Sequence, residues 1–172
     1  MTRNLTATEL KRLHRERRRA TDERLALILE DVQNPFNVGA IVRTAAAMNV
    51  DHVWMVGATP PITHPKVQKT ALGTHRYLSW TTTDAIDDAV KVARGDGYTV
   101  VGVELAEGAR PMAELESSAD VALVMGHEDR GLSKSALAAC DQLAYIPQLG
   151  KVASLNVATA ASIALYEMRR QG

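Results

Sequence analysis

Cysteine is almost missing from this chain of 172 residues, in which Cys140 is the only one. A single thiol excludes an intrachain disulfide and any zinc cluster built from several cysteines. Histidines do not replace them, because four of the five stand without metal-ligand spacing: His14, His52, His64 and His75. We therefore expect a protein without a bound metal.

Long apolar runs and aromatic side chains are also scarce. No run approaches the length that crosses a bilayer, and the N-terminus has no hydrophobic region of a signal peptide, so we expect the cytoplasm and no membrane partner. Aromatic residues make up only 4% of the chain, so stacking of bases on an aromatic platform is not its obvious way to hold a nucleic acid. The hydrophobic content of 46% is that of a folded domain with a sizeable core.

Net charge is absent as well, since 20 basic residues balance 20 acidic ones. Positive charge is nevertheless concentrated in one stretch, where only Glu16 opposes Lys11, Arg12, Arg15, Arg17, Arg18 and Arg19. Thr6-x-x-Glu9 is a capping box and predicts a helix over about 8–20. Most charged runs are solvated faces, but basic ones also contact phosphates. We expect residues 1–22 to form a basic helical arm and residues 23–172 to form one domain.

Strands and helices alternate along that domain. Apolar or β-branched runs predict strands at 25–29, 52–56, 77–80, 99–103, 121–125 and 143–146. Helices are expected at 37–48, at 84–94 with Asp84 as cap, at 133–139 with Ser133 as cap, and at 155–170. Residues 59–75 read as a long loop with one helical turn. This alternation predicts an α/β fold with a parallel sheet covered by helices on both faces.

Polar residues and glycines gather in three ordered motifs: Asn37-x-Gly39-x-Ile41-x-Arg43-Thr44-Ala45, Gly126-x-Glu128-x-x-Gly131-Leu132, and Gly150-x-x-x-Ser154-Leu155-Asn156-Val157. Pro147 should end the strand before the third motif, because it has no N–H for a ladder. From spacing alone, Asn37 is a plain helix cap, and either Ser154 or Asn156 can cap the last helix. His127 receives no role.

The three motifs together resemble the SpoU branch of the knotted RNA methyltransferases, over roughly residues 25–170. That family transfers methyl from S-adenosylmethionine to a ribose 2′-hydroxyl, and the chain looks most similar to the small tRNA guanosine ribose methyltransferases of the TrmH type. The resemblance implies S-adenosylmethionine as cofactor, RNA as substrate and a C-terminal trefoil knot. It also implies a homodimer in which each active site lies beside the partner subunit.

The resemblance assigns two groups of site residues. Main-chain groups at Gly126, Ile146 and Leu155 would hold the cofactor, with Glu104 or Leu105 completing its pocket. The catalytic residues would be Arg43, Asn37, Glu128, Ser154 and Asn156. Glu128 is expected to fix the direction of Arg43, or of another arginine, through an ion pair. Because a guanidinium keeps its proton, Arg43 suits stabilisation of a developing alkoxide, or a grip on a phosphate, better than a role as base.

Several alternatives stay open. A D-loop guanosine of tRNA is the expected target, followed by an anticodon-loop ribose or ribosomal RNA. A dinucleotide-dependent oxidoreductase would need a glycine fingerprint after the first strand, which this chain lacks. A non-catalytic RNA-binding module is disfavoured because the polar residues of all three motifs are present.

Overall fold

A parallel sheet of seven strands organises the molecule. The computed structural model describes residues 2–19, 22–115 and 120–171. The strands are β1 (Leu25–Glu30), β2 (His52–Val56), β3 (Ser79–Thr83), β4 (Thr99–Val103), β5 (Arg110–Pro111), β6 (Val121–Met125) and β7 (Gln142–Tyr145). Their order is β3-β2-β1-β6-β4-β7-β5, and each pairing among the described strands is parallel.

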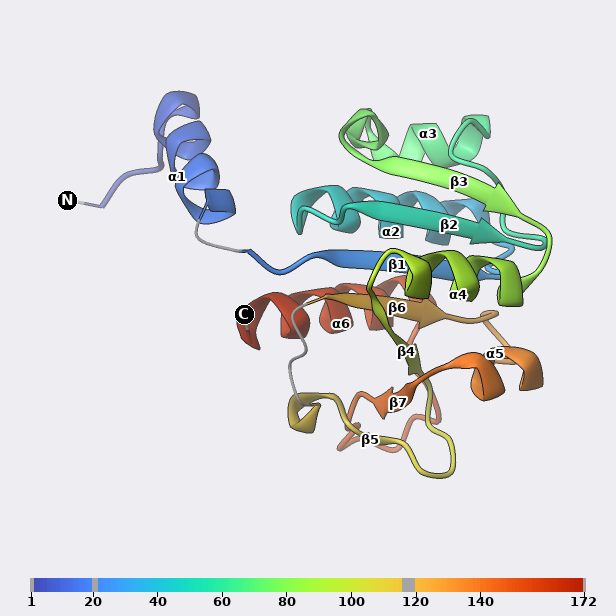
Figure 1. Ribbon diagram of the computed structural model, residues 1–172. Helices are drawn as coiled ribbons and strands as arrows, with labels where there is room; N and C mark the ends of the chain where they lie inside the picture. The colour runs from blue at the N-terminus through green and yellow to red at the C-terminus, as the bar shows by residue number, and fades with distance from the viewer. Residues whose placement is uncertain (1, 20–21, 116–119, 172) are drawn as a thin grey trace.

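Helices cover both faces of this sheet (Figure 1). They are α1 (Ala7–Arg19), α2 (Pro35–Ala47), α3 (Pro65–Ala71), α4 (Ile86–Gly95), α5 (Lys134–Ala139) and α6 (Val157–Gln171), with the 3₁₀ turns η1 (Thr74–Tyr77) and η2 (Met112–Glu114). In Figure 1, α4 and α5 lie in front of the sheet and α2 and α6 behind it. The predicted α/β architecture is confirmed. No helix in the described ranges is long and apolar enough to span a membrane.

The central strand β1 shows why a continuous apolar run folds this way. All six of its residues are buried. Successive side chains point to opposite faces, so Leu25, Leu27 and Leu29 join the core under α2 and α6. Ala26 and Ile28 join the core under α4 and α5. A strand that is buried on both faces needs apolar residues at every position, which is the pattern of a parallel sheet.

Several predicted boundaries were wrong. Residues 59–75 were expected to hold one helical turn, but they contain α3 and the start of η1. The third strand covers 79–83 rather than 77–80, because its pairing with β2 runs to Val56 and Thr83. Asp84 therefore cannot cap α4, whose N-cap is Ala85 without a side-chain bond. The two-residue strand β5 was not expected, and its Pro111 stands on the edge of the sheet, where no N–H is needed.

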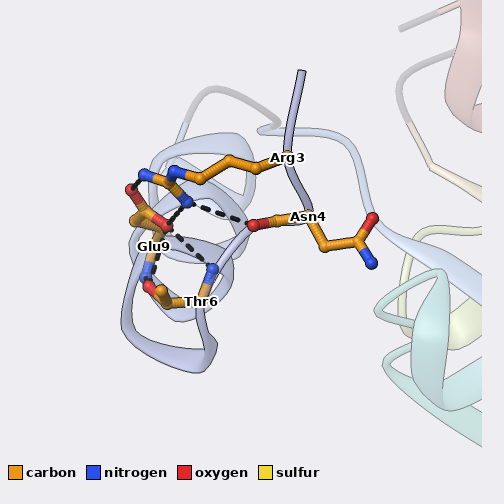
Figure 2. Close-up of polar contacts among 4 residues, drawn as sticks. All are labelled: Arg3, Asn4, Thr6 and Glu9. Atoms are coloured by element: carbon orange, nitrogen blue, oxygen red, sulfur yellow. Dashed lines mark hydrogen bonds and ion pairs between the residues drawn. The ribbon is translucent and has the colours of Figure 1, made fainter. Parts of the chain in front are cut away.

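The basic arm forms a helix, α1, that stands apart from the sheet (Figure 1). Its capping box is confirmed: Thr6 N donates to Glu9 Oε2 over 2.8 Å, and Glu9 N donates to Thr6 Oγ1 over 3.4 Å (Figure 2). Arg3 adds two bonds to the same carboxylate, of 2.9 and 2.6 Å. These bonds from Arg3 and Thr6 lower the pKa of Glu9. The predicted helix end at Ala20 lies outside the described residues.

Arg169 of α6 fastens the last helix to the end of α2. Its Nε donates to Met48 O over 2.8 Å and its Nη2 to Asn49 O over 2.7 Å, at the carbonyl end of α2. Its Nη1 donates to Glu23 O over 2.7 Å. The last carbonyls of a helix have no partner within the helix, so this guanidinium satisfies groups that would otherwise face water. The contact holds the first motif, on α2, against the helix that follows the third.

We expect Arg169→Met to lower the free energy of unfolding by about 2–4 kcal/mol, because three hydrogen bonds from a charged donor are lost. Urea denaturation measures the change. The control is Arg170→Met, one residue further on, whose guanidinium is exposed and pairs with Glu167 on the same helix. That variant should unfold like the wild type. Equal losses for the two variants would show that the Arg169 contacts do not stabilise the fold.

Candidate functional site

A chain of two amide side chains joins the three motifs. Asn37 Nδ2 donates to Glu128 Oε1 over 3.0 Å, and Asn156 Nδ2 donates to Asn37 Oδ1 over 3.1 Å. Glu128 lies 91 residues from Asn37, and Asn156 lies 119 residues from it. The structure therefore brings three of the five expected catalytic residues into direct contact, at the carboxyl end of the sheet where open α/β folds bind ligands.

The partners at the two ends of this hydrogen-bond network fix which amide atoms donate and which accept. At one end, the carboxylate of Glu128 also accepts hydrogen bonds from Gln33 N, over 3.1 Å, and Asn34 N, over 2.9 Å. An ionised carboxylate only accepts, so Asn37 must present its NH₂ group to Glu128. Burial acts to raise the pKa of Glu128, but the bond from Asn37 and the backbone N–H bonds outweigh it and hold that pKa below its usual value.

At the other end, Asn156 caps α6. Its Oδ1 accepts from Ala158 N over 2.9 Å and from Thr159 N over 3.2 Å. Backbone N–H groups only donate, so the NH₂ group of Asn156 is left to bind Asn37. This confirms Asn156 as the helix cap. The reading of Asn37 as a cap was wrong, because Asn34 caps α2 by accepting from Phe36 N over 2.9 Å.

Two adjoining clefts surround the network. The first, of about 280 Å³, lies beyond the ends of β4, β6 and β7. All five positions that were expected to hold a cofactor line it: Glu104, Leu105, Gly126, Ile146 and Leu155. The second cleft is lined by four of the expected catalytic residues: Asn37, Glu128, Ser154 and Asn156. Glu128, Ser154 and Leu155 belong to both linings, so the clefts meet at these residues.

Arg43 is the exception among the expected residues. It lies on the exposed side of α2 and lines neither cleft. Within the described ranges its guanidinium makes no hydrogen bond or ion pair. The expected ion pair between Glu128 and an arginine is not present among the described residues of this chain, where the carboxylate is bound by Asn37 and two backbone N–H groups. A sequence pattern that brings two charges near one site does not specify which partner lies within bonding distance.

Comparison with known proteins decides the family. The family model for the SpoU rRNA Methylase family matches residues 24–166. The chain belongs to the SpoU rRNA Methylase family. The match confirms the resemblance that the three motifs indicated.

Relatives of this SpoU family member act on different RNAs. The tRNA (guanosine(18)-2′-O)-methyltransferase of Thermus thermophilus is 36% identical over 155 residues, which cover 90% of this chain and 78% of that protein. The 23S rRNA (guanosine-2′-O-)-methyltransferase of Acinetobacter baylyi is 37% identical over 87% of this chain. The matched region spans only 61% of that relative's length.

Among solved structures, an AdoMet-bound rRNA methyltransferase from Sinorhizobium meliloti superimposes with a TM-score of 0.81 at 31% identity. The alignment covers 87% of this chain and 57% of the other.

The loop of the second motif is built around Gly126 in this SpoU family member. A Cβ at Gly126 would lie 2.4 Å from the carbonyl carbon of Gly131, so only glycine allows the loop to close on itself. His127 and Gly131 form an antiparallel bridge across it. Glu104 holds the far side, because its carboxylate accepts from Leu132 N over 3.0 Å. Glu104 thus shapes the cleft wall by binding the loop.

Glu30 is a buried carboxylate that the sequence reading missed, and it lines neither cleft. It is 6% exposed at the end of β1, and its carboxylate accepts from Ser133 N, over 3.0 Å, and from Ser133 Oγ, over 2.6 Å. Ser133 in turn caps α5, as expected, by accepting from Ala136 N. The signal was present in the sequence: a glutamate directly after five apolar strand residues is buried only when it has a partner.

The expected RNA-binding residues Lys11, Arg12, Arg15, Arg17 and Arg18 are exposed on α1. Arg12 pairs with Glu16 over 3.2 Å, and the side chain of Arg19 is not among those described. Ser154 lies at the junction of the clefts and does not cap α6. Within the described ranges, no three His, Cys, Asp or Glu side chains are arranged to hold a metal ion.

We expect Asn37→Asp to lower the free energy of unfolding at neutral pH by about 1–3 kcal/mol, because it places a second carboxylate against Glu128. In the wild type the pKa of Glu128 is depressed, so its contribution is present above the unfolded value of about 4.3 and is lost as pH falls through the folded value. In the variant the two carboxylates raise each other's pKa. The deficit measured by urea denaturation should therefore shrink as the pH is lowered.

Asn156→Asp is the matched control, because it adds the same charge at the other end of the network. Its carboxylate still accepts from Ala158 N and Thr159 N, and a negative charge at the start of α6 is favourable. It loses only the bond to Asn37, so it should cost less stability than Asn37→Asp. The opposite order would contradict the hydrogen-bond directions given above.

Proposed function

We propose that this protein transfers the methyl group of S-adenosylmethionine to a ribose 2′-hydroxyl of RNA, and that its target is a guanosine in the D-loop of tRNA. The observation that carries the proposal is the meeting of two clefts at Glu128, Ser154 and Leu155, which three family motifs build together. One cleft suits a methyl donor and the other a nucleotide. The relative from Thermus thermophilus, which acts on tRNA, supports the choice of target.

The first cleft fits S-adenosylmethionine by its chemistry. Gly126 lines this cleft together with Ile146 and Leu155, which offer apolar surface for an adenine. Glu104 and Leu105 line it as well. When bound, the cofactor supplies an activated methyl group on a cationic sulfonium. The carboxylates of Glu128 and Asp129, which also line this cleft, are suited to a cation. We propose that no metal takes part.

In the second cleft, the Glu128–Asn37–Asn156 network would hold the walls while Ser154 orients the ribose hydroxyl at the junction. The 2′-oxygen loses its proton as it forms a bond to the methyl carbon, and negative charge develops on it. Arg43 keeps its own proton under these conditions and would stabilise that charge. A fixed cation next to the oxygen stabilises the transition state more than the ground state.

We propose a homodimer in which Arg43 acts beside the clefts of the partner subunit. The proposal is supported by the position of Arg43 outside both clefts of its own chain. It is also supported by α6, which exposes Ile163 and Tyr166, 41% and 59% accessible, at neighbouring positions of one helix face. An apolar stripe on a surface helix is suited to burial against a second copy.

We further propose the domain organisation and the knot that the family resemblance implies. Residues 1–22 form the basic arm, with Lys11, Arg12, Arg15, Arg17, Arg18 and Arg19 contacting RNA phosphates, and residues 23–172 form the methyltransferase domain. The segment after β7 would thread through the region of the second and third motifs as a trefoil knot. Family membership and the return of α6 from β7 to the side of α2 support this. We also propose a cytoplasmic location, which suits an enzyme that acts on RNA.

The deciding experiment incubates the protein with labelled S-adenosylmethionine, in the presence of chelator, and with unmodified tRNA and naked ribosomal RNA side by side. Nuclease mapping then locates the methyl group. We expect label on a D-loop guanosine ribose of tRNA. Label on an anticodon-loop ribose or on ribosomal RNA alone would change the target, and label on a base, or none on any RNA, would overturn the proposed activity.

Replacing Arg43 tests the catalytic assignment. Arg43→Ala should slow methyl transfer by about 100- to 1,000-fold, because one group that stabilises the developing charge is lost. Calorimetry should show S-adenosylmethionine affinity nearly unchanged, because Arg43 does not line the first cleft. A variant with wild-type turnover would exclude Arg43 from the reaction.

Mixed subunits test the dimer. Arg43→Ala protein mixed with Leu155→Glu protein, whose first cleft is blocked, should regain about a quarter of wild-type activity, because half of the random dimers carry one intact site. No recovery, together with a monomer in light scattering, would contradict the dimer.

A further inference from the structure

Acidic residues are almost missing from one long stretch of the chain. Between Gln33 and Thr83 the only one is Asp51, although the chain contains 20 in total. The carboxylate of Asp51 accepts from Leu25 N over 2.9 Å at the start of β1. This stretch builds α2, α3 and η1, which pack on one another and which we call the α2–α3–η1 face. The packing is close, since a Cβ on Gly39 would lie 2.8 Å from Val67 O.

The cations of this face are exposed and unpaired. Among the described residues, Arg43, Lys66, Lys69 and Arg76 form no ion pair and donate no side-chain hydrogen bond. Some arginines elsewhere on the domain are paired with carboxylates: Arg24 binds Asp120 over 2.7 Å and Arg94 binds Asp141 over 2.6 Å. Positive charge without acidic neighbours attracts phosphates. Because these side chains form no ion pair, their charge is not needed to stabilise the fold.

Two exposed aromatic side chains accompany these cations. Phe36 is 53% exposed and Tyr77 is 68% exposed. Lys66 Nζ lies 6.0 Å from the centre of the Phe36 ring, and Arg76 Cζ lies 5.1 Å from the centre of the Tyr77 ring. The chain has only seven Phe, Trp and Tyr residues, so two exposed rings on one face are not explained by abundance. An exposed ring beside a cation is the arrangement that takes a stacked base and its phosphate.

Phe36 is also close in sequence to residues of the second cleft. It lies between Asn34 and Asn37, which both line that cleft. Phe36 and Arg43 are seven residues apart on the exposed side of α2, which corresponds to about 10 Å along the helix. Phe36 thus adjoins residues of the second cleft and lies on the exposed side of α2.

We propose that the α2–α3–η1 face binds the RNA strand that enters the second cleft. Lys66, Lys69 and Arg76 contact its phosphates, and Phe36 stacks an unpaired base next to the target nucleotide. The ligand class is RNA with unpaired nucleotides around the methylated position, because a base inside a duplex has no free face for a ring. This rests on the proposed function and adds a second RNA contact, separate from the basic arm.

The charge is tested with the double variant Lys66→Glu/Lys69→Glu. The matched control is Lys91→Glu/Lys134→Glu on α4 and α5, which makes the same charge change on the other face of the sheet (Figure 1). Binding to an unmodified tRNA transcript is measured across salt concentrations. We expect the first variant to bind at least about 10-fold more weakly than the control, with the slope of log K against log salt reduced by about 1.4–1.8 for two lost phosphate contacts.

The stacking is tested with Phe36→Leu and Phe36→Trp. Phe36→Leu keeps an apolar side chain but has no ring, so its tRNA affinity should fall by about 10-fold, whereas Phe36→Trp should restore it. Neither change should alter binding to a perfect RNA duplex, which offers no unpaired base. Thermal unfolding and S-adenosylmethionine binding are measured for all variants to establish that they fold.

The outcomes separate this inference from the proposed function. If the wild type methylates RNA and both charge-reversal variants bind RNA equally well, the face does not bind RNA and the inference is overturned. If Lys66→Glu/Lys69→Glu changes the oligomeric state and leaves RNA affinity unchanged, the face is a protein interface and the inference is equally wrong. If the wild type binds RNA through this face but transfers no methyl group to any RNA, the proposed function fails and the inference stands.

Discussion

The side chain of Asn37 is the point on which the site depends. Its amide has one donor end and one acceptor end, and these are occupied by Glu128 and Asn156 from two distant parts of the chain. An aspartate there would offer no donor to Glu128, and an apolar residue would bind neither neighbour. The first turn of α2 is thereby joined to the loop after β6 and to the start of α6. Ser154 is two residues before Asn156 and lines both clefts.

Carboxylates that bind backbone N–H groups hold the rest of the loop region. Glu30 binds the start of α5, Glu104 binds the second motif loop, and Glu128 binds the loop before α2. Loops at the carboxyl ends of parallel strands carry many N–H groups without a ladder partner, and an ionised carboxylate accepts several of them at once. The three glutamates therefore stabilise the loops by local hydrogen bonds, while the sheet below them is held by apolar packing.

The fold and most residues of the site could be predicted from the sequence, but the contacts between those residues could not. The apolar run of β1 and the alternation of strands and helices predicted the sheet. A strand that is buried on both faces has apolar residues at successive positions, and this pattern is visible in the sequence. The motifs predicted that Asn37, Glu128, Ser154 and Asn156 would meet, because members of one family share the positions of their site residues. The expected pairing of Glu128 with Arg43 or another arginine is not seen among the described residues of this chain, and Glu30 and β5 were missed. Which donor reaches which acceptor depends on distances that only the packed structure sets.

The residues shared by the two clefts have a thermodynamic consequence. Glu128, Ser154 and Leu155 line both clefts, so a ligand that shifts these residues in one cleft changes the fit of the other. Linkage makes such an effect reciprocal: whatever factor the first ligand imposes on the affinity of the second, the second imposes on the first. A shift of these shared residues alone therefore couples the two clefts, without any movement of the sheet below them.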